Sequence, residues 1–193
     1  MMKIRFVILF LSSFFVAFAN DPVEVDRVDF NRTREKWIQM EIQISCNGNP
    51  APDARDKRFL EDIQVTAYLG YAIDPAARKF DFYKAESRIV IMEENKDVNV
   101  YFYLPGMIVD RDRLDNDSEY YFVELAVKGQ DLPPQPKSFG QGINEASYNS
   151  MKELADSSDE TKHILMPYYL APPEFRGSVS DLPIYLRPDV EVE

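Results

Sequence analysis

Residues 36–46 read KWIQMEIQISC, and this stretch decides the fold of the chain. Its apolar side chains recur at every second position and are separated by Gln, Glu and Ser: Ile38, Met40, Ile42, Ile44 and Cys46. Strict alternation of this kind is typical of a β-strand with one face in the core and one face in water. Because strands of parallel sheets are usually apolar on both faces, we expect this strand to belong to an antiparallel sheet.

The same alternation recurs along most of the chain. It predicts strands near residues 23–30, 36–46, 61–73, 80–92, 97–104, 119–128 and 162–170. In the first strand the apolar phase slips between Val25 and Val28, as a β-bulge would cause. Prolines flank or interrupt residues 162–170 and 182–186, which places these late segments at a sheet edge. Short strands separated by turn residues predict a two-layer β-sandwich.

Two segments between the strands have helical composition. Pro105-Gly106 ends one strand abruptly, and residues 107–114 then allow one or two helical turns. Residues 129–161 form the largest insertion, in which a proline-rich loop precedes helix-forming residues 144–155. We therefore expect a partly helical insertion before the last strand.

Residues 114–123, LDNDSEYYFV, resemble the tyrosine corner of immunoglobulin-like and fibronectin type III domains. Either Tyr120 or Tyr121 could be the tyrosine of such a corner, and the alternation of apolar residues favours Tyr121 as the inward one. The Cys–Trp–Cys arrangement of antibody domains is missing, because Cys46 is the only cysteine. The fold class is therefore all-β, an immunoglobulin-like or fibronectin type III-like antiparallel β-sandwich, with Cys46 as a buried free thiol.

Residues 1–19 have the pattern of a secretory signal peptide. Lys3 and Arg5 precede a short apolar run, and Ala17-Phe18-Ala19 supplies small residues at the cleavage positions. The apolar run is shorter than the roughly 18 residues that a membrane-spanning helix needs. We therefore expect an exported single domain over residues 20–193, located in the periplasm, at the cell surface or outside the cell, with no membrane insertion of the mature chain.

The mature chain is strongly acidic. Without Lys3 and Arg5 the 22 basic residues become 20, against 33 acidic residues, so the formal charge is −13. Such a chain is repelled by nucleic acid and by anionic membrane surfaces, and neither is an expected partner.

The motifs of the common catalytic sites are missing from the sequence. His163 is the only histidine, which excludes metal sites that need two histidines. The nucleophile-elbow, P-loop and dinucleotide-binding glycine patterns are absent. Hydrolysis by a pair of carboxylates stays open, because 33 acidic residues allow many pairs.

One acidic stretch, residues 110–119, has oxygen ligands at short spacing: Asp110, Asp112, Asp115, Asp117 and Glu119. Calcium takes about 6–8 oxygen ligands, and this spacing suits a calcium loop. Leu114 and the missing glycine depart from the EF-hand pattern, and Arg111 and Arg113 neutralise their neighbours. A solvated turn is the competing interpretation, and we expect no other cofactor.

Aromatic residues also occur on faces that should be wet. Strands 36–46 and 97–104 are antiparallel neighbours in such a sandwich, which brings together Trp37, Tyr101, Tyr103, Gln39 and Asn99. We call these five residues the aromatic platform. An exposed platform of rings and amides suits a protein partner or, alternatively, a glycan. The remaining interpretation is that the protein's own loops cover the rings.

The whole layout resembles a family of small exported immunoglobulin-like proteins that Verrucomicrobia encode beside type IV pilus-like components. The features that carry the resemblance are the signal peptide, residues 98–109 (VNVYFYLPGMIV) and the strand at 120–127. The resemblance implies a fold and a cell-surface context, and it implies no reaction.

The sequence thus favours a non-enzymatic, exported β-sandwich that acts through its surface on a protein partner, in a cell-envelope or pilus-like assembly. A carbohydrate-binding module is the first alternative, and a carboxylate-based hydrolase is the second.

Overall fold

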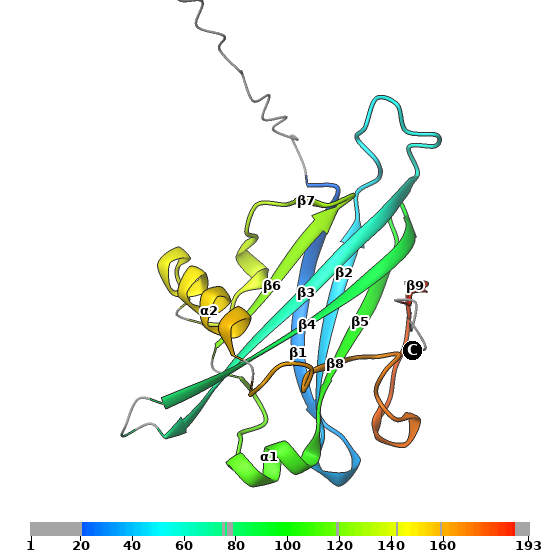
Figure 1. Cartoon of the computed structure of the whole chain (residues 1–193). Coiled ribbons are helices and arrows are strands. Elements are labelled where there is room, and N and C mark those ends of the chain that lie inside the picture. The colour runs from blue at the N-terminus through cyan, green and yellow to red at the C-terminus, as the bar shows by residue number, and fades with distance from the viewer. Residues whose placement is uncertain are drawn as a thin grey trace, which may run out of the picture.

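The computed structural model describes residues 21–74, 76, 79–118, 120–141, 143–158 and 160–187 (Figure 1). The predicted signal peptide, residues 1–19, lies outside the described residues.

Two antiparallel sheets pack face to face, so the predicted β-sandwich is confirmed (Figure 1). The four-stranded sheet has the order β1 (Val23–Arg32), β2 (Ile38–Cys46), β5 (Asp97–Leu104) and β8 (Met166–Pro167). The five-stranded sheet has the order β7 (Gln130–Asp131), β6 (Tyr120–Val127), β3 (Phe59–Asp74), β4 (Lys79–Glu93) and β9 (Tyr185–Leu186). The fourth strand, β4, pairs with β3 and so departs from the constant-type immunoglobulin order, in which the fourth strand joins the first sheet.

The alternating sequence of β2 places its side chains as predicted. Ile38, Met40, Ile42, Ile44 and Cys46 all lie in the core between the sheets. The predicted bulge in β1 is present, because the pairing with β2 shifts between Val25 and Arg27. The extra residue returns Val28 and Phe30 to the inner face, where both pack against the core. Burial raises the pKa of the Cys46 thiol, as expected of a packed side chain.

A short helix follows β5 directly and confirms the helical turns expected there. Helix α1 (Gly106–Asp112) begins after Pro105 and lies beside the 3₁₀ turn η1 (Arg34–Lys36). The two elements are so close that a Cβ atom at position 106 would lie 1.8 Å from the Glu35 carbonyl oxygen. Only glycine therefore fits at this position.

The insertion contains the expected helix. Asn144 caps α2 (Glu145–Ser157) by accepting a hydrogen bond of 2.9 Å from the Ser147 N–H. Met151 and Ala155 of α2 pack with Tyr68 and Phe122 on the outer face of the five-stranded sheet. A second 3₁₀ turn, η2 (Pro136–Ser138), precedes this helix.

The last part of the chain forms less strand than the alternation predicts. Within residues 162–170 only β8 pairs, and within 182–186 only β9 pairs, each over two residues. The 3₁₀ turn η3 (Pro173–Phe175) lies between them. Prolines at 167, 172, 173 and 183 have no N–H to donate and therefore prevent a longer ladder.

The corner before β6 is held by a serine. The Ser118 hydroxyl donates to the Gly70 carbonyl at 2.9 Å and accepts from the Gly70 N–H at 3.3 Å. Tyr121 packs its ring on Phe30, with 5.5 Å between ring centroids, and so faces inward as predicted. Among the described residues neither the Tyr120 nor the Tyr121 hydroxyl makes the hydrogen bond that defines a tyrosine corner, and Ser118 ties β6 to β3 instead.

The inner and outer faces of β2 should respond differently to truncation. Ile42 is fully buried, so Ile42→Ala should lower the free energy of unfolding by about 2–5 kcal/mol. Gln43 lies on the outer face and makes only a long hydrogen bond of 3.4 Å to Asp97. Gln43→Ala should therefore change the free energy of unfolding by less than about 0.5 kcal/mol. Urea titration of both variants checks this, and equal effects would contradict the assigned strand faces.

Candidate functional site

The structure brings the aromatic platform together as the sequence predicts. In the β2–β5 ladder Gln39 lies opposite Tyr103, and Gln43 lies opposite Asn99. Trp37 immediately precedes β2, and it clusters with Tyr101 and Tyr103. The platform therefore occupies one continuous area on the outer face of the four-stranded sheet.

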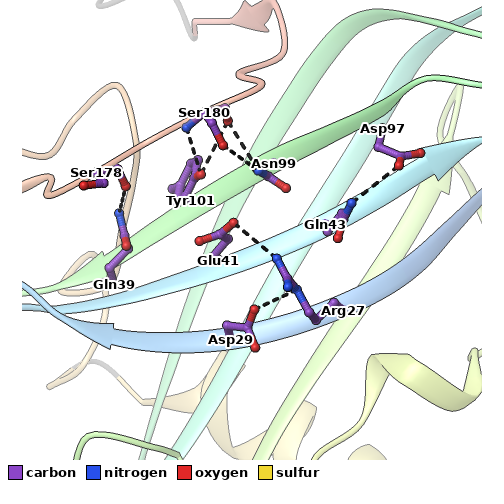
Figure 2. A network of polar contacts seen from close by, with 10 residues as sticks. All are labelled: Arg27, Asp29, Gln39, Glu41, Gln43, Asp97, Asn99, Tyr101, Ser178 and Ser180. Atoms are coloured by element: carbon purple, nitrogen blue, oxygen red, sulfur yellow. Dashed lines mark hydrogen bonds and ion pairs between the residues drawn. The ribbon is translucent and has the colours of Figure 1, made fainter.

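The expectation that this platform is exposed is wrong. The exposed fractions are 9% for Trp37, 3% for Gln39, 7% for Asn99, 1% for Tyr101 and 0% for Tyr103. Residues 168–180, which we call the C-terminal strap, fold back over the sheet (Figure 2). Strand alternation reports which side chains share a face, but a covering segment from far along the chain leaves no local signal.

The strap is bound mainly through its backbone. The Gln39 amide donates to the carbonyl oxygens of Arg176 at 2.7 Å and Ser178 at 3.2 Å. The Tyr103 hydroxyl also donates to the Arg176 carbonyl, at 2.9 Å. Above these bonds Phe175 stacks on Trp37, with 5.0 Å between ring centroids. The amides and rings that suggested a ligand surface thus hold an irregular segment of the same chain.

The far end of the strap is fastened in the same way. The Asn99 amide donates to the Ser180 hydroxyl at 3.2 Å, and the Ser180 N–H donates to the Tyr101 hydroxyl at 3.1 Å (Figure 2). Asn99 and Tyr101 are buried on the sheet, so their polar groups need partners, and the strap supplies them.

The uncovered part of this sheet face carries charges. Arg27 lies 2.7 Å from Asp29 and 3.8 Å from Glu41, joining β1 to β2 (Figure 2). Exposed ion pairs of this kind contribute little to stability. Because one arginine serves two carboxylates, this strip keeps a net negative charge.

The acidic stretch does not assemble a calcium site from its described residues. Asp110 pairs with Lys36 at 2.5 Å, and Asp112 pairs with Arg111 at 2.6 Å. Asp117 accepts a hydrogen bond from Asn116 at 2.8 Å, Asp115 is exposed, and Glu119 lies outside the described residues. Within the described ranges no three His, Cys, Asp or Glu side chains gather as metal ligands would. The aspartates meet cations and amides of their own chain, as in a solvated turn.

Sequence reasoning missed a groove on the side of the sandwich formed by β1 and β6. It has a volume of about 610 Å³ and runs between β1 and the start of β6. Val28, Phe30 and Tyr121 give it an apolar floor, while Asp29, Asp117 and Gln141 line its rim. The bulge in β1 is the one sequence signal that points here, because it sets the side chains that follow it.

A second apolar surface lies at the opposite sheet edge. Val90, Ile184 and Leu186 are 41%, 64% and 48% exposed. The Val90 N–H donates to the Ile184 carbonyl at 2.8 Å, and Leu186 pairs with Arg88. These side chains form an open apolar edge.

The comparisons with known proteins identify the fold. The chain is similar to a crystal structure of a protein from Akkermansia muciniphila, with a TM-score of 0.62 and 12% sequence identity. The match covers 87% of this chain and 94% of the other, and the source organism belongs to the Verrucomicrobia. No protein-family model and no curated protein matches the sequence. At this identity the similarity establishes a shared β-sandwich and nothing about activity.

One structural finding bears on membranes. No helix among the described residues is long and apolar enough to cross a bilayer.

Because the strap covers Trp37, this residue should now contribute to folding. Trp37→Ala removes the stacking partner of Phe175 and should lower the free energy of unfolding by about 3 kcal/mol. Chemical denaturation checks this, with Phe175→Ala as the matched variant on the strap side. A Trp37→Ala protein as stable as the unsubstituted chain would mean that the strap does not cover the platform in solution.

Alkaline pH should unfold the protein through its tyrosines. Burial raises the pKa of Tyr103 to about 12, above its ordinary value of 10.0. Between pH 10 and pH 12 the unfolded chain releases this proton while the folded chain retains it. The contribution of Tyr103 to the stability of the fold is therefore fully present below pH 10 and is lost as the pH rises toward 12. Melting temperatures across this range check the fall, which should be shallower in Tyr103→Phe.

Proposed function

We propose that this chain is an exported, non-enzymatic binding protein that acts through its surface in a cell-envelope or pilus-like assembly. The observation that carries the proposal is the groove beside β1, which offers an apolar floor of Val28, Phe30 and Tyr121 with an acidic rim. Concave apolar surfaces with polar rims are where proteins usually bind their partners. The signal-peptide pattern of residues 1–19 supports the exported location.

The verrucomicrobial setting has separate support. The sequence resembles small exported immunoglobulin-like proteins of that phylum, and the fold is similar to that of an Akkermansia muciniphila protein. Association with pilus-like components belongs to the proposal and rests on the resemblance.

The two alternatives differ in their support. A carbohydrate-binding module was suggested by the aromatic platform, whose rings lie beneath the strap. A carboxylate-based hydrolase retains one favourable observation, because Asp29 and Asp117 both line the groove. If the chain is a hydrolase, glycoside hydrolysis should require both Asp29 and Asp117. If it is a binding protein, no glycoside hydrolysis should be detected.

Site-specific crosslinking in native cells tests the proposed function. A photoreactive phenylalanine analogue at Gln141, on the groove rim, should give a discrete crosslinked product in the envelope or secreted fraction. The same analogue at Ile184, on the exposed edge beside β4, is the matched control and should give none. No product at position 141, or the same product from both positions, would contradict a binding role for this groove.

A further inference from the structure

We infer that the groove beside β1 binds an extended, basic peptide segment of a partner protein, which pairs with the free edge of β1 as an added strand. This inference rests on the proposed function and deepens it, because it names the chemistry of the partner.

The first observation is that β1 is an edge strand with backbone groups facing away from its neighbour. Among the described strands it pairs with β2 alone. In an antiparallel pair, alternate residues direct both N–H and C=O away from the partner strand. Val23 and Val25 do so, and their outward groups are bound by Gln135: the Val25 N–H donates to its amide oxygen at 2.7 Å, and its amide nitrogen donates to the Val23 carbonyl at 2.9 Å.

This contact shows how the edge is satisfied where it is covered. Gln135 is 7% exposed and supplies both an acceptor and a donor, which is what a residue of a neighbouring strand would supply. At the other end of β1 the Asn116 amide donates to the Phe30 carbonyl at 3.2 Å. Side-chain amides therefore close the two ends of the edge.

Between these two amides the edge stays open. The register after the bulge gives Val28 the same orientation as Phe30, so its N–H and C=O point away from β2. Neither group, nor the Phe30 N–H, has a hydrogen-bond partner among the described residues. The groove lies against this part of β1. An added strand would supply the missing acceptors and donor, as in other cases of strand addition to a sheet edge.

The side chains at the groove specify which strand would fit. An added strand directs alternate side chains into the groove and away from it. The side chains that point into the groove should be apolar, because they contact Phe30 and Tyr121, which pack against each other. The side chains that point away from the groove lie near Asp29 and Asp117 on the rim. The nearby Arg27 is already paired with Asp29 and Glu41. Lysine or arginine at the intervening positions matches this charge.

The overall charge also decides between possible occupants. The mature chain carries a formal charge of −13, so a second copy would be repelled and a basic segment attracted. We therefore commit to a basic heterologous partner, and pairing between two copies is an outcome of the test.

Amide hydrogen exchange on the full mature chain tests the pairing directly. The probe is a short synthetic peptide of alternating valine and lysine, blocked at both ends. Its addition should slow exchange at Val28 and Phe30 by about tenfold or more, because both amides gain acceptors. Arg27 and Asp29 are internal controls, since their amides already face β2. Binding without slower exchange at Val28 and Phe30 would overturn strand addition.

Variants separate the backbone from the side chain. Val28→Pro removes the outward N–H, and proline is tolerated on an edge strand at such a position. It should weaken peptide binding by about tenfold, while Val28→Ala keeps the N–H and should weaken it less. Melting temperatures show whether the Val28→Pro variant folds. If it does not fold, amide exchange in the unsubstituted protein decides whether the peptide pairs with the backbone of β1.

Peptide controls test the chemistry of the occupant. Glutamate in place of lysine should abolish binding, and added salt should weaken binding of the lysine peptide. Equal binding of both peptides would contradict the inference that the partner is basic. A crosslink between two copies of this chain at position 141 would contradict the inference that the partner is a different protein. If the peptide fails while crosslinking at Gln141 succeeds only there, the proposed function stands and this inference falls.

Discussion

The structure depends on the antiparallel pairing of β2 with β5. Its register sets Ile42 opposite Val100 on the inner face and Gln39 opposite Tyr103 on the outer face. The inner row meets the five-stranded sheet and forms the core, while the outer row binds the C-terminal strap. A one-residue slip would exchange the two rows and lose both contacts, so this register is strongly specified.

Each outer face of the sandwich is partly covered by a segment from the second half of the chain. Helix α2 packs on Tyr68 and Phe122 of one sheet, and the strap packs on Trp37 and Tyr103 of the other. With a single buried cysteine the domain holds these segments without an internal disulfide. Aromatic packing and hydrogen bonds from buried side-chain amides to backbone carbonyls hold the segments instead, which is why the outer face of β5 is rich in tyrosine.

Sheet edges are where this fold stays exposed to other chains. Open edges invite pairing, and proteins usually block them with short strands, bulges or charges. Here β9 is two residues long, and Gln135 and Asn116 bond to the two ends of β1. The middle of β1 remains open beside an apolar groove with an acidic rim. The negative charge of the chain and this open stretch of β1 direct the proposed function toward a basic, extended partner.

The sequence alone determined the fold class, because strand alternation is a local property. The faces of β2, the bulge near Val25 and the helix after Asn144 all follow from neighbouring residues and were predicted correctly. The same information placed Trp37 beside Tyr101. Strand alternation can assign a shared face without showing whether that face is wet.

Only the tertiary structure decided what covers each face. The strap reaches Gln39 from 137 residues away, and Asp110 meets Lys36 from 74 residues away, so neither contact has a local signature. The same holds for the groove, whose lining comes from β1, from the start of β6 and from Gln141. Long-range packing therefore made the predicted ligand platform part of the folded interior and left the middle of β1 unpaired beside the groove.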